Sequence, residues 1–264
     1  MNKEYKDLKF TDDFMFCKIL STNLDLTREL LELILGVKIR KVKLTEPQKE
    51  IEILAQGRGI RLDVYVEDDK NTIYDIEMQT TKQKDLPKRS RYYQGMIDMN
   101  IIERGDRFEA LKKTFIIFIC LSDPFDKGRH IYTFETRCKE DLSLSLGDEI
   151  TKVFLNPNGV LDDVSPEMDA FLKYLKSGIA ESDFTRKLEV QVQDAVNHKE
   201  WRTEYMTLYM RDLEKKDEGR NETLYSLVQK GAISVETAAV EANISVEEFE
   251  KQMLEAGYKI PALN

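Results

Sequence analysis

The side chains best suited to bind a metal or take part in a reaction lie in RLDVYVEDDKNTIYDIEMQ, residues 61–79. This stretch is typical of two short β-strands joined by an acidic turn, and residues two apart along a strand share one face. Asp63 lies on the polar face of the first strand, and Asp75, Glu77 and Gln79 lie on the polar face of the second. With the turn centred near its lysine, Asp63 is expected opposite Glu77.

Two carboxylates in that position predict a metal site. Cβ atoms directly opposite each other on antiparallel strands are about 4.5–5.5 Å apart, and like charges there repel unless a cation lies between them. Mg²⁺ commonly takes one or two carboxylates and keeps several waters. Gln79 adds an uncharged amide that can orient a water or a phosphate oxygen. The alternative is the solvated face of an ordinary hairpin, on which the carboxylates bind nothing.

A basic segment follows this hairpin. Residues 82–91, KQKDLPKRSR, carry five basic side chains and one acidic one. The formal net charge of −9 argues weakly against a nucleic-acid partner, but residues 212–255 supply much of it, with eleven acids against five bases. Arg89 is expected to contact phosphate, because its planar guanidinium suits phosphate oxygens. The lysines could instead simply keep a helix start soluble.

Composition limits the class of protein. The 264 residues, 41% hydrophobic and 34% charged, predict one large domain or one domain with an appendage. We expect no membrane span and no secretory signal, since no apolar run approaches about 20 residues and the first residues lack a hydrophobic segment. Three scattered cysteines fit a reducing cytoplasm. Cys17 is interpreted as a core residue, and His130 and His198 as structural.

The order of expected elements predicts an α/β fold, with helices flanking one sheet. Helices are expected over residues 11–35, interrupted near 21–23, and from Pro87 to about residue 103. Strands are expected at residues 38–44, in the hairpin, and at 114–121, 131–134 and 151–155.

From residue 165 onward the pattern is helical. One short helix is expected at residues 168–175 and one long helix at 184–217, followed by three short helices with turns at Gly231 and Asn243. The last two have the residue pattern of a helix-turn-helix. The second of them carries glutamates rather than the basic or amide side chains of a DNA-reading helix, which favours packing or oligomerisation.

The motif D-x13-E-x-Q, placed after an acidic helix start and before a basic helix, resembles the PD-(D/E)XK nuclease superfamily. It is most similar to the branch of recombination-promoting nucleases, the transposase-31-like group. The resemblance covers about residues 8–215 and rests on FTDDFMFCKIL, RLDVYV, YDIEMQ, PKRSRYYQGMID, FIIFICLSDPFDKGRHIYTFE and VFLNPNG. It implies a restriction-endonuclease-like core with a central mixed sheet in residues 1–160. A helical extension over 161–217 and a small acidic helical region over 218–264 would complete the chain.

The resemblance also implies roles for the hairpin residues. Asp63 and Glu77 match the metal-binding acids, and the carbonyl of Met78 would complete the protein ligands. Gln79 stands where the superfamily usually has lysine, as is typical of this branch. Asp13 is our choice for the acid on the first helix.

Other residues of the matching motifs are assigned by the same resemblance. Asp12 is the alternative to Asp13 as the helix acid. Arg89 and Tyr93 fall in a segment expected to face the scissile phosphate or shape the groove. The residues expected to bind DNA are Lys88, Arg89, Arg91 and Tyr93.

The expected function is therefore that of a Mg²⁺-dependent DNA endonuclease, with Mn²⁺ able to substitute. It would be a cytoplasmic homo-oligomer associated with recombination or transposition of mobile elements. Two alternatives stay open: a catalytically inactive nuclease-fold protein acting as a DNA-binding or interaction module, and a metal-dependent phosphohydrolase acting on RNA or nucleotides.

Overall fold

The predicted hairpin lies inside a six-stranded mixed sheet. The computed structural model describes residues 3–47, 49–51 and 59–260, and in it β4 (Val64–Asp68) pairs with β5 (Ile73–Gln79) in antiparallel fashion. The strand order is β1-β4-β5-β6-β8-β7, with β5, β6 and β8 mutually parallel. The remaining bounds are β1 Val42–Pro47, β6 Thr114–Cys120, β7 Ile131–Phe134 and β8 Ile150–Leu155. A separate two-stranded sheet joins β2 (Glu50–Ile51) to β3 (Ile60–Arg61).

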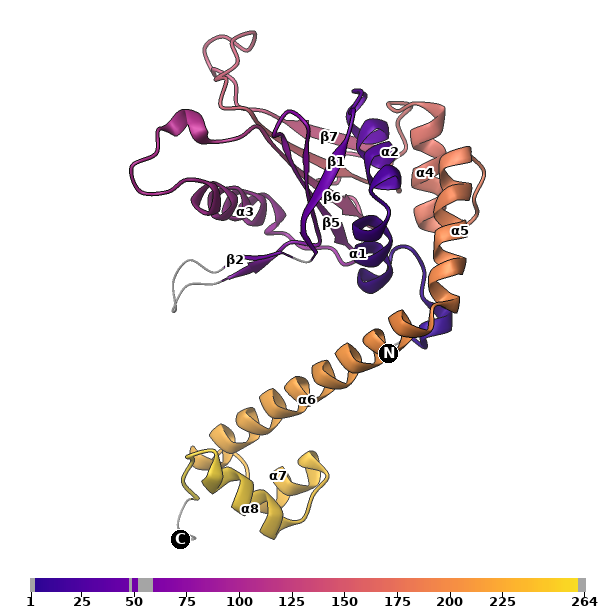
Figure 1. The fold of residues 1–264 in the computed structure, drawn as a ribbon. Helices are drawn as coiled ribbons and strands as arrows, with labels where there is room; N and C mark the ends of the chain where they lie inside the picture. The colour runs from indigo at the N-terminus through magenta and orange to yellow at the C-terminus, as the bar shows by residue number, and fades with distance from the viewer. Residues whose placement is uncertain (1–2, 48, 52–58, 261–264) are drawn as a thin grey trace. The chain divides into compact units, whose positions relative to one another are not determined.

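Helices cover both faces of the central sheet (Figure 1). α3 (Leu86–Ile101) connects β5 to the parallel strand β6 and packs on one face. α1 (Asp13–Thr22) and α2 (Leu24–Leu35) pack on β1 and β4 from the other side. α4 (Pro166–Ser177) and α5 (Asp183–Asn197) lie outside α1 and α2. The central strands are therefore enclosed, and the α/β fold with a mixed sheet between helices is confirmed.

The polar face of the hairpin is buried rather than solvated. It shares its side of the sheet with a core cluster that includes Tyr65, Ile73 and Phe118, and α3 adds Tyr93 and Ile97 to that cluster. The alternative of an ordinary solvated hairpin face is therefore wrong, because the crossover helix covers it. Carboxylates at these positions lie in a low-dielectric environment, where each needs a hydrogen-bond or charge partner.

Most expected elements of the first 177 residues are present, with shifted ends. The helix interruption occurs at Asn23, whose side chain caps α2, and α2 ends at Gly36 in the left-handed conformation with φ 65°. β1 begins at Val42, four residues later than expected. The long helix predicted over residues 184–217 is wrong, because the chain breaks at His198 between α5 and α6 (Lys199–Gln229).

The chain divides into two compact units, Met1–His198 and Lys199–Asn264. In the second unit, α7 (Val235–Ala242) and α8 (Val246–Glu255) pack against the end of α6, with a turn at Asn243 at φ 59°. The boundary expected between residues 217 and 218 falls inside α6. Across the residues described, no helix is long and apolar enough to cross a membrane.

Candidate metal centre

Asp63 and Glu77 lie side by side at the open end of the hairpin. The β4–β5 register pairs Val64 with Ile76, so the next step along each strand places Asp63 opposite Glu77. The backbone N–H of Asp63 donates to Glu77 Oε1 at 3.0 Å, and the backbone N–H of Met78 donates to Asp63 Oδ2 at 3.1 Å. The backbone of each strand thus fixes the carboxylate of the other.

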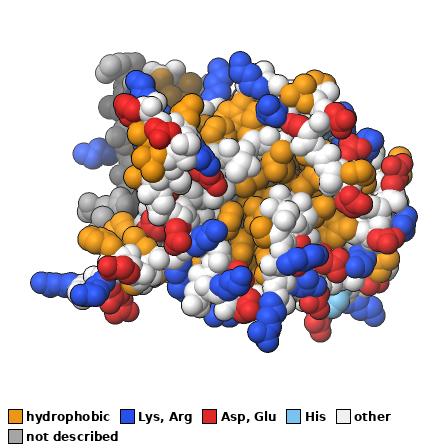
Figure 2. Space-filling model, turned by 90° about the horizontal axis from the view of Figure 1, so that it is seen from above, with side chains coloured by type: hydrophobic (Ala, Val, Ile, Leu, Met, Phe, Trp, Pro, Cys, Tyr) orange, Lys and Arg blue, Asp and Glu red, His pale blue; other side chains and the backbone are white. Residues whose placement is uncertain are grey.

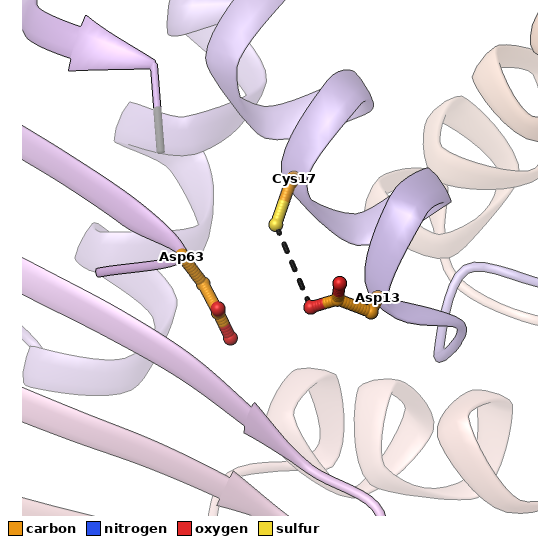
Figure 3. Close-up of side chains that lie close together, drawn as sticks. All are labelled: Asp13, Cys17 and Asp63. Carbon is orange, nitrogen blue, oxygen red and sulfur yellow. Dashed lines mark hydrogen bonds between the residues drawn. The ribbon is translucent and has the colours of Figure 1, made fainter. Parts of the chain in front are cut away.

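A third acid faces this pair from the first turn of α1. Ligand atoms of Asp13, Cys17 and Asp63 all lie within 4.8 Å of one another, and Figure 3 shows the three side chains converging between α1 and the hairpin. The Cys17 thiol lies 3.9 Å from Asp13 Oδ1, one helical turn along α1. Cys17 is buried, as expected of a core residue, yet it also lines the site. No local sequence pattern indicates this, because Cys17 and Asp63 lie on different elements that only the folded chain brings together.

Asp12 points elsewhere. Its carboxylate pairs with Lys3 Nζ at 2.6 Å and accepts the backbone N–H of Lys9 at 2.7 Å. Of the two acids considered on the first helix, Asp13 is the one near Asp63.

Arg89 on α3 reaches over the same strand end. Its Nη2 donates to Glu77 Oε2 at 2.9 Å, its Nη1 to Gln79 Oε1 at 3.0 Å, and its Nε to the Tyr93 hydroxyl at 2.7 Å. The guanidinium also lies over the rings of Tyr93 and Phe118. A single arginine thus supplies positive charge beside a nearly inaccessible glutamate.

The amide of Gln79 is engaged within the protein. Its Nε2 donates to the backbone oxygen of Thr81 at 2.8 Å and its Oε1 accepts from Arg89. In this arrangement Gln79 accepts a hydrogen bond from Arg89 and helps to hold the guanidinium in place. Arg89 thus holds its positive charge between Glu77 and Gln79.

Burial and mutual repulsion raise the pKa values of two acids of the site. Burial, followed by the charge of Asp13, raises the pKa of Asp63 to about 6. Burial, followed by the charge of Asp63, raises the pKa of Glu77 to about 8, although the Asp63 N–H and Arg89 oppose this shift. Carboxyl groups with such raised pKa values are typical of functional sites, and a bound cation would favour their charged forms.

A basic groove lies beside the acids. It is a hollow of about 630 Å³ next to α3, and all four residues expected to bind DNA lie on its wall. Arg61 and Tyr92 also line it, and sequence reasoning did not single out Arg61. The full lining is Gly59, Ile60, Arg61, Gln83, Asp85, Lys88, Arg89, Arg91, Tyr92 and Tyr93.

A sequence model described as a PD-(D/E)XK nuclease family transposase matches residues 10–216. The chain belongs to this family. Membership supports a nuclease or transposase-like role with DNA as substrate, and PD-(D/E)XK nucleases generally use divalent metals. No curated protein and no solved structure matches the chain significantly.

The residues present fit the divalent metal that the PD-(D/E)XK family implies. Asp13, Asp63 and Glu77 offer carboxylate oxygens, the hard ligands that Mg²⁺ and Mn²⁺ prefer. Arg89 holds Glu77 Oε2, so Glu77 can offer that oxygen to an ion only after the guanidinium moves away.

Proposed function

We propose that this PD-(D/E)XK family protein is a metal-dependent DNA endonuclease that hydrolyses phosphodiester bonds during recombination or transposition of mobile elements. The observation that carries the proposal is the convergence of Asp63, Glu77 and Asp13 beside a basic groove. Hard oxygen ligands and a neighbouring surface for a polyanion are the two things such a reaction requires.

In this proposal Asp63, Glu77 and the carbonyl of Met78 hold Mg²⁺, or Mn²⁺ in its place, with Asp13 as the nearby third acid. The N–H and C=O of one strand residue point to the same side of the strand. Because the Met78 N–H reaches Asp63, its carbonyl faces the same side. When bound, the metal would lower the pKa of a water ligand and stabilise charge on the phosphate.

The protein's own groups position the DNA. Arg89, once released from Glu77, can present its planar fork to a phosphate oxygen while Gln79 and Tyr93 keep it close. Lys88 and Arg91 extend the positive charge along the groove. Gln79 therefore acts through Arg89, as a positioning residue.

Nicking of supercoiled plasmid tests this function. The wild-type protein should cut with Mg²⁺ or Mn²⁺ and stop in EDTA. Asp63→Ala and Glu77→Ala should leave the plasmid intact while remaining folded by circular dichroism. Asp12→Asn is the matched control, because Asp12 is the neighbouring helix acid that points away, and it should cut like the wild type.

One observation favours a second function. The ion pair between Arg89 and Glu77 neutralises a proposed metal ligand, as it would in a nuclease-fold protein that binds DNA without cutting it. A wild-type protein that is inert with both metals, yet binds DNA, would establish that function instead.

Assembly and location belong to the same proposal. We place the protein in the cytoplasm as a homo-oligomer, with the acidic second unit contributing the contacts between copies. Light scattering coupled to size-exclusion chromatography measures the oligomeric mass directly.

A further inference from the structure

Cys17 gives one side of the candidate metal centre a ligand of a different kind. One ligand atom from each of Asp13, Cys17 and Asp63 lies within 4.8 Å of the other two, and Figure 3 shows the thiol pointing from α1 toward the hairpin. We call these three side chains the thiol cluster. Carboxylates alone suit the hard ions of the proposed nuclease, whereas a sulfur ligand favours Zn²⁺ over Mg²⁺ and Mn²⁺.

The spacing within the thiol cluster suits a tetrahedral ion after small movements of the side chains. Zinc binds cysteine sulfur at about 2.3 Å and carboxylate oxygen at about 2.0–2.2 Å, which places tetrahedral ligand atoms roughly 3.5 Å apart. Asp13 and Cys17 are one helical turn apart on α1, with the Cys17 Sγ 3.9 Å from Asp13 Oδ1, so one helix presents two ligands together. Three protein ligands and a water fill the four positions of many zinc sites.

The surroundings hold the ligands in place and leave a way in for an ion. Cys17 is 3% exposed and Asp63 is 9% exposed, so the core fixes both, whereas Asp13 is exposed to solvent. The Met78 N–H donates to Asp63 Oδ2, and Arg61 Nη2 lies 3.5 Å from Asp13 Oδ2. These contacts use one oxygen of each acid, so the other oxygen can bind an ion.

An ion in the thiol cluster needs no movement of Arg89. Among the described residues, the side-chain hydrogen bonds of Arg89 go to Glu77, Gln79 and Tyr93, and an ion on the α1 side displaces none of them. An ion between Asp63 and Glu77 must instead first displace the guanidinium. Both positions use Asp63, so an ion in the thiol cluster takes a ligand from the ion of the proposed nuclease.

We propose that Asp13, Cys17 and Asp63 form an inhibitory Zn²⁺ site, in which the ion takes Asp63 and so excludes Mg²⁺ or Mn²⁺ from the position beside Glu77. The binding of Zn²⁺ follows from the three ligands, and only the inhibition rests on the proposed function. The thiol gives its proton to solvent as the bond between sulfur and zinc forms. Cys17 is thus a ligand of the inhibitory ion and does not hold the ion of the nuclease.

Absorption spectroscopy with Co²⁺ tests the site on the full chain without any measurement of activity. Co²⁺ takes the place of Zn²⁺, and a sulfur ligand gives it a charge-transfer band in the near ultraviolet. We expect this band in the wild type and its loss in Cys17→Ser. Cys138→Ser is the matched control and should keep the band. The Cys138 Sγ also lies beside a carboxylate, 3.4 Å from Glu140 Oε2, but it belongs to no three-ligand group in the described part of the chain.

Calorimetric titration measures the selectivity that the thiol confers. Cys17→Ser should weaken Zn²⁺ binding by at least about 10–100-fold, the loss that removal of a mere hydrogen-bond partner of a ligand typically causes. It should leave Mn²⁺ affinity within the same order of magnitude, because carboxylate oxygens hold that ion. In wild type loaded with Zn²⁺, Mn²⁺ should bind more weakly than in metal-free protein, since Asp63 is already taken. Cys17→Ala, which keeps the apolar packing, replaces Cys17→Ser if thermal unfolding in EDTA shows that Cys17→Ser is not folded.

Each result decides a defined claim. A wild type without the Co²⁺ band, or a Cys17→Ser variant with an undiminished band, would overturn the zinc site. Unchanged Mn²⁺ affinity in the Zn²⁺-loaded wild type would overturn the inhibition.

Plasmid nicking separates this inference from the proposed function. Zn²⁺ added to a reaction with Mg²⁺ should slow the wild type, and Cys17→Ser should need more Zn²⁺ for the same fractional slowing. The Co²⁺ band in a protein that does not cut would overturn the nuclease function and leave the zinc site standing. Cutting by a wild type without the band would leave the nuclease function standing and overturn the zinc site.

Discussion

At the scale of single residues, Arg89 links the acidic and basic parts of the site. Its guanidinium bonds to Glu77, Gln79 and Tyr93 together, so it pairs with one of the acids and also lies at the edge of the basic groove. A cation bound by Glu77 must compete with it. Arg89 should therefore weaken metal binding. In the proposed function it also contacts a DNA phosphate.

Replacing Arg89 by methionine tests both roles. Arg89→Met should raise Mn²⁺ affinity in calorimetry, because a competing positive charge is removed, and lower the rate of plasmid nicking by about 10²–10³-fold. Arg89→Lys keeps a charge without the planar fork and should show a smaller change in affinity with a clear loss of nicking. Weaker Mn²⁺ binding in Arg89→Met would contradict the competition.

The raised pKa values of the acids predict how stability varies with pH. Asp63 and Glu77 shift from ordinary pKa values of 3.8 and 4.5 to about 6 and about 8 in the folded protein. Between these values the folded state binds more protons than the unfolded state, so unfolding releases protons and the free energy of unfolding falls as pH rises. In EDTA, the urea midpoint should fall between pH 5 and pH 8.

Two comparisons check that the site acids cause this slope. Glu77→Gln should flatten it, because the amide does not titrate. Added Mn²⁺ should raise the midpoint most at pH 8, since metals bind the deprotonated ligands. A midpoint that rises with pH in EDTA would be inconsistent with buried, proton-binding acids.

At the scale of elements, the hairpin turn sets the register that brings Asp63 to Glu77. Asp68 Oδ1 accepts the backbone N–H groups of Lys70 and Thr72, both at 2.8 Å, and Oδ2 accepts the Tyr74 hydroxyl at 2.9 Å. Asn71 adopts a left-handed conformation at φ 63°. The turn is thus built around one buried carboxylate.

Removing that carboxylate should destabilise the hairpin. Asp68→Ala leaves two backbone donors and a buried hydroxyl without their partner, which should lower the free energy of unfolding by about 2–4 kcal/mol, measured with urea. Asp69→Ala, at the exposed neighbouring position, should change it by less than about 0.5 kcal/mol. Similar effects of the two substitutions would refute the role given to Asp68.

The same elements show what the sequence could and could not reveal. Alternation and turn position predicted that Asp63 faces Glu77, because strand period and register are local properties. The burial of Asp75 and the hydrogen bond from Arg89 to Gln79 depend on α3 lying over the polar face, which no local pattern encodes. The break at His198 was also missed. Helical residues continue on both sides of it, and no Gly or Pro marks His198, where the backbone turns extended at φ −80° and ψ 109°.

At the scale of the whole molecule, basic side chains gather in one groove and acidic side chains gather near the end of the chain. The basic groove carries Arg61, Lys88, Arg89 and Arg91, whereas the end of the chain is acidic. The face seen in Figure 2 has basic and acidic side chains interspersed around hydrophobic ones, so it presents no continuous basic surface. The four basic side chains that line the groove make it the expected place for a polyanion.

Salt dependence of DNA binding tests this placement. Lys88→Ala should weaken binding to DNA of any sequence and reduce the slope of log affinity against log salt by about 1, because one phosphate contact is lost. Lys176→Ala is the control, since Lys176 lies on α4 and lines a different hollow. Fluorescence anisotropy at several salt concentrations measures both slopes, and equal slopes in the two variants would place the DNA elsewhere.

The division into two units gives a prediction about truncation. Every proposed ligand and every residue of the basic groove belongs to Met1–His198. A protein ending at residue 198 should therefore fold and bind Mn²⁺ with unchanged affinity, while its mass by light scattering should fall to that of a monomer. Loss of Mn²⁺ binding would show that the second unit contributes to the site, and an unchanged oligomeric state would place the contacts between copies in the first unit.

Asp63 and Glu77 are proposed to share a metal ion. Anomalous scattering from crystals grown with Mn²⁺ tests it most directly, because it locates the ion among the side chains. We predict a peak between the two carboxylates and the Met78 carbonyl, with Arg89 no longer bonded to Glu77. The absence of a peak there, with Arg89 still bonded to Glu77, would contradict a metal site at these two acids.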